Sequence, residues 1–374
     1  MIFPLISNGR RNLVTNKKRR VLLIDLGPQF GGIETYLVNL ADLVADEVAL
    51  YLLCVHPELS ERLAGEQVKI FRLPYFCGKL KALRFLTTAF VVPLLLVRYR
   101  IHTVQLNGFL DSFLIFPARL LGCSTVYTRH GTFEIEFYSW FRQPLKRLGR
   151  KLAQWSVRFT THVVCVSQVV AESVQPVLPV SRYSVIENWI TGQTPFMPPP
   201  VDLRSHARVL CASRLEHYKG IHLLIAAARR LPHAEVVIVG DGSDRVWLEK
   251  LAAGLPNVRF AGFQRDLEAF FLEADIFVMP SMGPEGLPMV SLEAMSRGLP
   301  CIFSDLPVHC EITDQGRAAY LFRSGEVESL VTALREMIAS PSKRLTYALE
   351  AHRVVASRYT EANAREAYLR VLAG

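Results

Sequence analysis

The sequence predicts two α/β domains, each built on a parallel β-sheet. Its 374 residues exceed the roughly 250–300 that one hydrophobic core usually serves. Short, almost continuously apolar runs alternate with helical patterns, which is typical of parallel strands buried on both faces by crossover helices. A proline-rich segment interrupts this alternation once, and the alternation then starts again. We therefore expect two doubly wound, Rossmann-like domains that face each other across a cleft.

The first domain is expected over residues 1–190, with strands predicted from VLLIDLG, VALYLLCV, VKIFRLP, IHTVQLNG, STVYTRHG and HVVCVSQ. The segment TGQTPFMPPPVDLRS has four prolines between positions 195 and 200, so residues 191–207 are expected to form an extended linker. A second sheet is predicted over residues 208–355 from RVLCASRL, AEVVIVGDG, VRFAGF, DIFVMPS, PCIFSD and AAYLFRSG. Residues 356–374 are expected to form a helix that packs back on the first domain.

The positive charge of the chain is concentrated in the first domain. The formal net charge is +9; residues 1–190 have 23 Lys and Arg against 13 Asp and Glu, whereas residues 191–374 have 20 against 21. Three stretches without an acidic residue, 10–20, 79–100 and 142–158, hold the excess. Such a basic face attracts the phosphates of a lipid surface or of a nucleic acid.

Two apolar segments lie within these basic stretches. Residues 85–97, FLTTAFVVPLLLV, are too few to span a bilayer, which needs about 20, so they form either a buried crossover helix or an interfacial one. The second segment has apolar residues at three- and four-residue steps among cations, which fits either a core-facing or a membrane-facing stripe. Its residues are Leu145, Leu148, Leu152, Trp155 and Phe159, with Lys146, Arg147, Arg150 and Lys151. We expect the first domain to dock on the anionic inner face of the cytoplasmic membrane and not on nucleic acid.

The remaining composition predicts a cytoplasmic protein without a metal site. The seven cysteines form no CxxC pair and are expected to be buried thiols in a reducing compartment. In the first twenty residues the basic residues follow the apolar stretch, which is not the order of a secretory signal. The sequence has no Asp-x-Asp motif and no His or Cys cluster with metal-ligand spacing.

Two segments at predicted strand ends suit a phosphorylated ligand. Gly31 and Gly32 open an amphipathic helix, where glycine lets a ligand approach the backbone and the helix end attracts an anion. A tight strand-to-helix turn is the alternative interpretation. Arg214 and Lys219, in SRLEHYKG, follow the first strand of the second domain and suit a diphosphate. A solvated basic turn is the alternative there.

The segment DIFVMPSMGPEGLPMVSLEAMSRGLPCIFSD is the most informative one. A strand is expected to end at Pro280, and a helix to begin near Leu287 and to end at Gly298. Glu285 then lies before the helix and Glu293 about two turns into it. The two carboxylates could accept hydrogen bonds from sugar and ribose hydroxyls, while the helix end holds phosphates. Compensation of the helix dipole is the alternative role for these glutamates.

These motifs occur in a recognisable order: GGIE, TRHG, CVSQ, IENW, SRLEHYKG, VGDGSD, VRFAGF and Glu285-x7-Glu293. From Val21 to the last helix the chain resembles the family 4 glycosyltransferases. The resemblance implies a GT-B fold, and retaining transfer of a hexosyl or hexosaminyl group from a UDP- or GDP-type nucleotide sugar. It implies no separate cofactor, because the nucleotide sugar is the donor substrate, and no metal, because cations and fixed dipoles stabilise the leaving group.

The resemblance also implies roles for individual residues. Arg214 and Lys219 would bind the diphosphate, Glu293 the ribose hydroxyls and Glu285 the hydroxyls of the donor sugar. His130, after the TVYTR strand, would face the donor sugar from the first domain. The other donor-binding positions implied are Gly31, Gly32, Gly240, Phe263 (whose backbone would meet the base), Gly286, Leu287 and Met289.

The chain departs from the family pattern at two places. Position 288 is a proline, which offers no amide to a phosphate, so the amides of Leu287 and Met289 must supply that contact. In IENWI, Glu187, Asn188 and Trp189 stand where Pro-Asn-Gly is more usual, which leaves the role of this loop open.

The expected acceptor is a glycan or a lipid-linked glycan in the assembly of a surface polysaccharide or lipopolysaccharide. Two other functions remain possible on the sequence: a nucleotide-sugar epimerase of the same fold, and a non-catalytic module that binds a membrane or nucleic acid through its basic face. The sequence does not indicate the donor base, the linkage or the oligomeric state.

Overall fold

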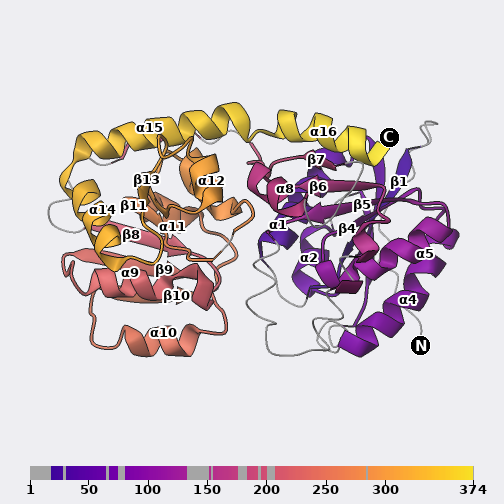
Figure 1. Cartoon of the computed structure of the whole chain (residues 1–374), viewed down its shortest axis with the longest axis horizontal. Coiled ribbons are helices and arrows are strands. Elements are labelled where there is room, and N and C mark those ends of the chain that lie inside the picture. The colour runs from indigo at the N-terminus through magenta and orange to yellow at the C-terminus, as the bar shows by residue number, and fades with distance from the viewer. Residues whose placement is uncertain are drawn as a thin grey trace. The chain divides into compact units, whose positions relative to one another are not determined.

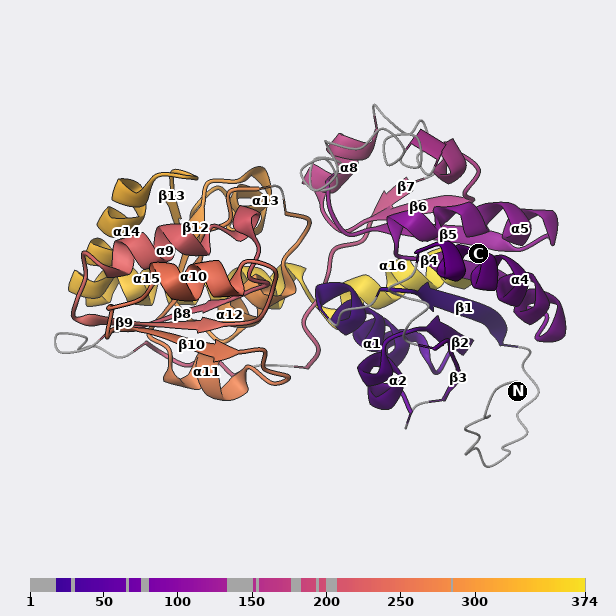
Figure 2. The ribbon, with the colours of Figure 1, turned by 90° about the horizontal axis from the view of Figure 1, so that it is seen from below.

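The computed structural model of the chain describes residues 18–27, 31–64, 67–74, 81–132, 151–152, 155–175, 183–192, 195–199, 207–283 and 285–373. The chain forms two compact units, each with a parallel β-sheet and with helices on both faces (Figures 1 and 2). Unit 1 comprises Met1–Asn188 and Ala362–Gly374, and unit 2 comprises Trp189–Glu361. The predicted fold class, two parallel-sheet α/β domains, is confirmed.

The sheet of unit 1 has seven strands in the order β3-β2-β1-β4-β5-β6-β7. Figure 2 shows this order from β7 at the top to β3 at the bottom. The order reverses between β1 and β4, and in doubly wound folds the carboxyl ends of strands at such a reversal are where ligands bind. The strands are β1 (Arg19–Asp25), β2 (Val48–Cys54), β3 (Val68–Arg72), β4 (Thr103–Leu106), β5 (Ser124–Arg129), β6 (His162–Cys165) and β7 (Tyr183–Val185).

The position of β1 in the centre of the sheet explains why its sequence, VLLID, is almost continuously apolar. It pairs with β2 on one side, with Val21 opposite Leu50, and with β4 on the other, with Val21 opposite Thr103. All four residues from Val21 to Ile24 are fully buried because helices cover both faces. The helices of unit 1 are α1 (Gly32–Val44), α2 (Pro57–Arg62), α4 (Lys81–Arg98), the 3-10 helix η1 (Phe109–Leu114), α5 (Ile115–Leu120), α8 (Gln168–Val174) and α16 (Glu361–Ala373).

The last helix, α16, belongs to unit 1 although it follows unit 2 in the sequence. The Tyr36 hydroxyl donates to the Tyr368 hydroxyl (2.8 Å), and Arg365 donates to the carbonyl of Leu43 (2.8 Å). Both contacts join α16 to α1, so the end of the chain is part of the core of unit 1. In the sequence, α15 (Pro341–Arg358) of unit 2 comes directly before it.

Helix α4 contains the apolar segment 85–97, for which two interpretations were open, and it has features of both. One face is buried, with Thr88 and Val92 fully inaccessible to solvent. The opposite face has large apolar side chains at steps of four, four and three residues, which places them on one line along the helix. These residues, here called the α4 stripe, are between 56% and 78% exposed: Leu86, Phe90, Leu94 and Val97. Among the described helices, none is long and apolar enough to cross a membrane.

The second predicted stripe is only partly within the described residues. Leu145, Leu148, Lys146, Arg147 and Arg150 lie outside them. Within them, Leu152, Trp155 and Phe159 are 44–56% exposed. The rings of Trp155 and Phe159 lie 4.9 Å apart, and both contact Phe116 of α5. This part of the stripe is therefore half-buried against α5.

The sheet of unit 2 has six strands in the order β10-β9-β8-β11-β12-β13. They are β8 (Ala207–Ala212), β9 (Ala234–Val239), β10 (Val258–Gly262), β11 (Ile276–Met279), β12 (Cys301–Ser304) and β13 (Tyr320–Phe322). The helices of unit 2 are η2 (His217–Lys219), α9 (Ile221–Ala228), α10 (Arg245–Leu251), α11 (Glu268–Glu273), α12 (Met289–Ser296), α13 (Pro307–Ile312), α14 (Val327–Ala339) and α15. Figures 1 and 2 label the α-helices among them. One large apolar cluster, from Val209 of β8 to Met337 of α14, joins the sheet to its helices.

Candidate functional site

The predicted residues of unit 2 gather at one edge of its sheet. Arg214 and Lys219 follow β8, Gly240 follows β9, Phe263 follows β10 and Glu285 follows β11. These four strands are neighbours in the sheet and are parallel, so their carboxyl ends lie at the same edge. The structure therefore brings together residues that are up to 71 positions apart, from 214 to 285.

A buried ion pair lies at the centre of this edge. The Nζ of Lys219 is 2.6 Å from the Oε1 of Glu285, and the Ser281 hydroxyl donates to the same oxygen at 2.6 Å. Burial disfavours both charges, but the opposite charge of the partner outweighs it. The pKa of Lys219 is raised and that of Glu285 is lowered. Both groups are therefore charged at neutral pH.

Two loops are held against each other to form this pair. Gly220 has a φ of +67°, and a Cβ there would lie 1.9 Å from the carbonyl oxygen of Pro280. Only glycine allows the loop after β8 to approach the loop after β11 so closely. The amides of Met282 and Gly283 both donate to the carbonyl of Tyr218, at 2.7 and 3.0 Å. The position of Lys219 relative to Glu285 is thus set by backbone contacts.

Arg214 is the more accessible of the two cations. Half of its side chain is exposed, whereas 11% of the Lys219 side chain is. The guanidinium donates to the hydroxyl of Tyr218 at 2.6 Å and to Glu216 at 3.3 Å. Both cations lie within 6.0 Å of the Tyr218 ring centre. An incoming anion could therefore reach Arg214 directly, whereas Lys219 is mostly covered by protein.

Helix α12 begins later than the sequence suggested. It starts at Met289, two residues after Leu287, and Pro288 is its N-cap residue. A residue that precedes a proline is disfavoured in the α conformation, which keeps Leu287 out of the helix. Glu293 is consequently just past the first turn and not two turns in. Since Pro288 has no amide hydrogen, the first N–H donor of the helix belongs to Met289, as the sequence implied.

Glu293 is available as a hydrogen-bond acceptor. Its side chain is partly buried, and burial raises its pKa despite the nearby charge of Arg297. Among the described residues, no group donates a hydrogen bond to its carboxylate, while Arg297 is held by Glu268 and by the carbonyl of Glu293. A hydroxyl of a ligand could therefore bind to this carboxylate without displacing a protein contact.

Gly240 and Phe263 come directly after β9 and β10, which are neighbouring strands of the sheet. A Cβ on Gly240, whose φ is +133°, would meet the carbonyl oxygen of Ser213 at 1.9 Å. Its amide donates to the carbonyl of Gly262 at 2.8 Å, so Gly240 permits a close backbone approach and does not offer a free donor. Phe263 is 47% exposed directly after β10.

His130 of unit 1 is neutral and hydrogen-bonded. The Asn107 amide donates to the carbonyl of Ile24, which leaves its Oδ1, 3.1 Å from the Nε2 of His130, to accept the imidazole proton. Burial, and then the charge of Arg129, lowers the pKa of His130 to about 3. Its ring also contacts Tyr36 edge-on, with centroids 4.6 Å apart. The role that the resemblance implies for His130 toward the donor sugar stays a prediction.

Three carboxylates lie near one another at the carboxyl edge of the unit 1 sheet. Burial, and then the charges of Glu34 and Asp111, hold the pKa of Asp25 well above its usual value. The Oδ1 of Asp25 accepts from the amide of Gly27, whereas its Oδ2 has no hydrogen-bond partner within the described ranges. Glu34 accepts from the amide of Gly31 at 2.7 Å. This edge is therefore acidic.

The carboxylates also bear on the predicted anion site at Gly31 and Gly32. The Gly31 amide is already bound to Glu34, and Gly32 begins helix α1 with open space where a Cβ would lie. Residues 28–30 of the same loop lie outside the described residues. Anion binding by the two glycines stays a prediction.

Sequence reasoning missed Asp25, Asp111, Asn107, Ser281 and Tyr218. Asp25 had a visible signal, since it is a charged residue that ends an otherwise apolar strand, VLLID. Ser281 and Tyr218 had none, because their contacts depend on how two loops meet. Groups of three or more His, Cys, Asp or Glu placed to hold a metal ion do not occur among the described residues.

The chain matches two family models that together cover most of its length. "Glycosyltransferase Family 4" matches residues 30–191, and "Glycosyl transferases group 1" matches residues 204–353. The lipopolysaccharide core biosynthesis glycosyltransferase LpsE of Rhizobium meliloti is 31% identical over 236 residues, which are 61% of this chain and 69% of that protein. An Escherichia coli enzyme named UDP-Gal:alpha-D-GlcNAc-diphosphoundecaprenol alpha-1,3-galactosyltransferase is 24% identical over 345 residues, 86% of this chain and 88% of that protein.

Solved structures of glycosyltransferases share the fold. HepE of Anabaena in complex with UDP-glucose superimposes with a TM-score of 0.77 at 20% identity, covering 95% of this chain and 99% of that one. The lipopolysaccharide outer core galactosyltransferase WaaB, in its apo form, gives a TM-score of 0.69 at 18% identity, with coverage of 95% and 99%. At these identities the likeness concerns the fold alone.

Proposed function

The chain belongs to glycosyltransferase family 4 and is a glycosyltransferase with the GT-B fold; from this premise we propose that it moves a hexosyl or hexosaminyl group from a UDP- or GDP-sugar to a lipid-linked glycan. The observation that carries the proposal is the carboxyl edge of the unit 2 sheet. There, Arg214 and Lys219 follow β8, Glu285 is paired with Lys219, and Glu293 lies in the helix that follows β11; both carboxylates can accept from hydroxyls.

The cations would bind the diphosphate and stabilise it as it leaves. Arg214 presents its guanidinium toward solvent and can form the two parallel hydrogen bonds that a phosphate accepts. Lys219 supplies a second, buried charge, which acts more strongly because the surroundings are less polarisable than water. The first amides of α12, beginning with Met289, would add donors at the positive end of the helix dipole.

The carboxylates would orient the two sugars of the donor. Both Lys219 and Ser281 bind the Oε1 of Glu285, and within the described part of the chain no group donates to its Oε2. That oxygen could accept from a hydroxyl of the transferred sugar, while Glu293 accepts from the ribose. Phe263 would lie near the base.

Retention and independence from metal are part of the proposal. Retention means that the acceptor oxygen bonds to the anomeric carbon on the face from which the diphosphate leaves. The C–O bond to the diphosphate breaks, and the proton of the acceptor hydroxyl goes to the departing phosphate oxygen. The charge that develops on that oxygen would be stabilised by Arg214, Lys219 and the start of α12, as fixed cations and dipoles can do.

The acceptor would be presented at the inner face of the cytoplasmic membrane. The positive charge of residues 1–190 and the exposed α4 stripe favour an anionic lipid surface. Two relatives named above act in lipopolysaccharide core biosynthesis or on a diphosphoundecaprenol-linked sugar, and an acceptor of that class suits this surface.

Incubation of the full chain with UDP- and GDP-sugars, with and without lipid-linked acceptors, tests the proposal. We expect transfer or slow donor hydrolysis, with the anomeric configuration of the product unchanged by NMR. Excess EDTA should leave the rate within about twofold, because the proposed site has no metal to lose. Inversion at a ring carbon without transfer would mean an epimerase, and absence of turnover with every donor would mean a binding module; either result would refute the proposal.

A further inference from the structure

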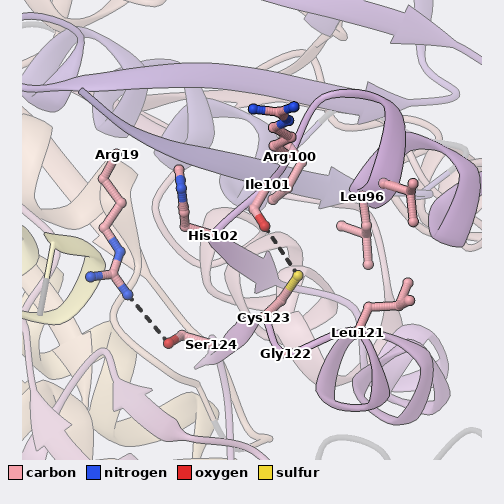
Figure 3. A pocket seen from close by; sticks show the side chains of 10 residues that line it. Arg19, Leu96, Arg100, Ile101, His102, Leu121, Gly122, Cys123 and Ser124 are labelled. Carbon is pink, nitrogen blue, oxygen red and sulfur yellow. Dashed lines mark hydrogen bonds between the residues drawn. The ribbon is translucent and has the colours of Figure 1, made fainter. Parts of the chain in front are cut away.

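A pocket of about 660 Å³ lies at the edge of the unit 1 sheet opposite to the carboxyl ends. It is formed where β1, β4 and β5 begin and where helices α4 and α5 end (Figure 3). Since the residues implied in catalysis follow the carboxyl ends of strands, this pocket belongs to a different surface. Its polar wall includes Arg19, Arg100 and His102, and its apolar wall includes Leu96, Val97 and Leu121.

The two helices that border the pocket end in the same capping motif but with different residues. The Ile101 amide donates to the carbonyl five residues before it in α4 (3.0 Å), and the Cys123 amide does the same in α5 (2.9 Å). This motif needs a left-handed residue, for which glycine is the usual choice. Helix α5 has Gly122 there (φ +77°), whereas α4 has Arg100 (φ +47°). The chain thus holds an arginine beside the pocket in a conformation that disfavours it.

The polar wall consists of hydrogen-bond donors. Arg19 donates to the hydroxyls of Thr103 (3.2 Å) and Ser124 (3.4 Å), which fix its guanidinium at the pocket wall. The Nδ1 of His102 accepts from the amide of Arg20 at 3.0 Å, so the ring proton is on Nε2. Burial and the neighbouring arginines lower the pKa of His102, which keeps it a neutral donor at pH 7. None of the ten lining residues is acidic.

The dipoles of the bordering helices act against an anion, but they are weaker than the cations. Each helix carries about half an elementary negative charge at its carboxyl end. Arg19 and Arg100 each carry a full positive charge, and Arg98 and Arg119 lie in the last turns of α4 and α5. The pocket is therefore positive overall.

The apolar wall continues onto the outer surface of the unit. Val97 belongs both to the pocket and to the α4 stripe, which runs along the helix for three turns. On the other side, Leu120 is 86% and Leu121 is 45% exposed at the end of α5. A small hydrophilic anion would gain nothing from these side chains, whereas the acyl chains of a lipid would bury them.

We propose that this pocket binds the phosphate of one anionic phospholipid, with Arg100, Arg19 and His102 as donors and the acyl chains along the α4 stripe. The proposal rests on the membrane docking stated under the proposed function, but not on the transfer reaction. It gives the docked protein a fixed orientation, because one lipid enters a defined pocket at the amino edge of the sheet.

The test compares two arginines that are two positions apart. Arg100→Gly removes the pocket cation and installs the residue that the capping motif prefers, so the urea midpoint should stay equal or rise. Arg98→Ser removes the same charge from the same helix end but not from the pocket, because Arg98 is not a lining residue. The probes are dihexanoyl phosphatidylglycerol below its micelle concentration, dihexanoyl phosphatidylcholine and inorganic phosphate.

We expect the wild type to bind the phosphatidylglycerol at least tenfold more tightly than the other two probes. Arg100→Gly should weaken that binding about tenfold, the loss of one charge-assisted contact, and Arg98→Ser less than about threefold. Equal losses in the two variants would overturn the pocket, and so would inorganic phosphate that binds as tightly as the lipid.

Donor hydrolysis measured on the same samples separates this proposal from the proposed function. If the protein hydrolyses the donor and Arg100→Gly leaves its affinity for the lipid unchanged, the lipid pocket is refuted and the proposed function is not. If the protein does not hydrolyse the donor but Arg100→Gly weakens its binding of the lipid, the proposed reaction is refuted and the lipid pocket is supported.

Discussion

The carboxyl edges of the two sheets have the same architecture, but their buried carboxylates have different partners. In unit 2 the buried carboxylate of Glu285 is paired with Lys219, and Arg214 adds an accessible positive charge. In unit 1 the buried carboxylate of Asp25 lies near two further carboxylates, and its pKa is raised. One doubly wound scaffold can therefore serve an anionic ligand or an uncharged, hydroxyl-rich one, according to the few side chains that follow its strands.

The comparison suggests how the two units divide the work of a glycosyltransferase. We expect a diphosphate to be attracted to Arg214 at the edge of unit 2, whereas the carboxylates of unit 1 disfavour the anion site predicted at Gly31 and Gly32. The sugar ring of a glycan acceptor has many hydroxyls to donate and no charge of its own, so carboxylates suit it as hydrogen-bond acceptors. The predictions below test this difference, from the largest expected effect to the smallest.

Removing Lys219 should have the largest effect, because it leaves Glu285 buried without its partner. Lys219→Ala should abolish transfer and lower the free energy of unfolding by about 3–5 kcal/mol. Urea unfolding and a transfer assay measure the two effects. The double variant Lys219→Met with Glu285→Gln is the control, and it should recover stability but not activity. Normal turnover in Lys219→Ala would contradict the proposal that Lys219 binds the diphosphate of the donor.

Replacing Arg214 should affect the reaction without affecting the fold. Its guanidinium is half exposed, so Arg214→Ala should unfold like the wild type. The variant should lose about 2–5 kcal/mol of transition-state stabilisation, which lowers kcat/KM roughly 30- to 5000-fold. Arg230→Ala is a matched control, since that arginine is also partly exposed in unit 2, where it pairs with Glu328 on the surface. Equal kcat/KM values for the two variants would contradict the role of Arg214.

Neutralising one buried carboxylate in each unit should change stability in opposite directions. The pKa of Glu285 is lowered in the folded state, so its contribution is present above the unfolded pKa, near 4.3, and is lost as pH falls through the folded value. The pKa of Asp25 is raised in the folded state. The stability that its neutral form contributes is therefore fully present below the unfolded pKa, near 3.9, and is lost as pH rises through the folded value.

At pH 7, Glu285→Gln should therefore destabilise the protein, and Asp25→Asn should stabilise it. Urea midpoints between pH 4 and 8 measure both effects. The asparagine keeps an oxygen that accepts from the amide of Gly27, and its own amide group can donate to Glu34, so both neighbours of Asp25 keep a partner. Changes of the same sign in both variants would remove the electrostatic contrast between the two units.

The smallest expected effect concerns His130. Because its pKa is lowered to about 3, it stays neutral throughout the physiological range. Between pH 5 and 8 the rate of transfer should show no change that is due to titration of this histidine. The NMR resonances of its ring should stay constant at every pH above about 4. A titration near 6.5 would show that the ring is more solvated than the structure indicates.

Much of the unit 2 site was visible in the sequence, because its residues follow apolar runs that must be strands. Arg214, Lys219 and Glu285 each lie a few residues after such a run, and parallel strands bring such positions to one edge. The sequence did not reveal that Lys219 and Glu285 form a buried pair, since that depends on Gly220 letting one loop touch another.

Other features of the structure could not be predicted from the sequence, because the local residue pattern does not determine them. The start of α12 was placed too early, although Pro288 disfavours a helical residue at Leu287. The segment 85–97 is apolar except for Thr87 and Thr88, so its periodicity could not indicate which face is covered. The acidic group of unit 1 needed three elements to meet: β1 supplies Asp25, α1 Glu34 and η1 Asp111.

Direct binding of UDP and GDP tests the central claim, that the edge of unit 2 holds the diphosphate of the donor. Titration calorimetry on the wild type, on Lys219→Met with Glu285→Gln, and on Asp25→Asn needs neither the acceptor nor turnover. We predict that the wild type and Asp25→Asn bind at least one of the nucleotides with equal affinity, and that the double variant binds it at least tenfold more weakly. Unchanged affinity in the double variant, with a changed affinity in Asp25→Asn, would contradict the account and place the nucleotide on unit 1.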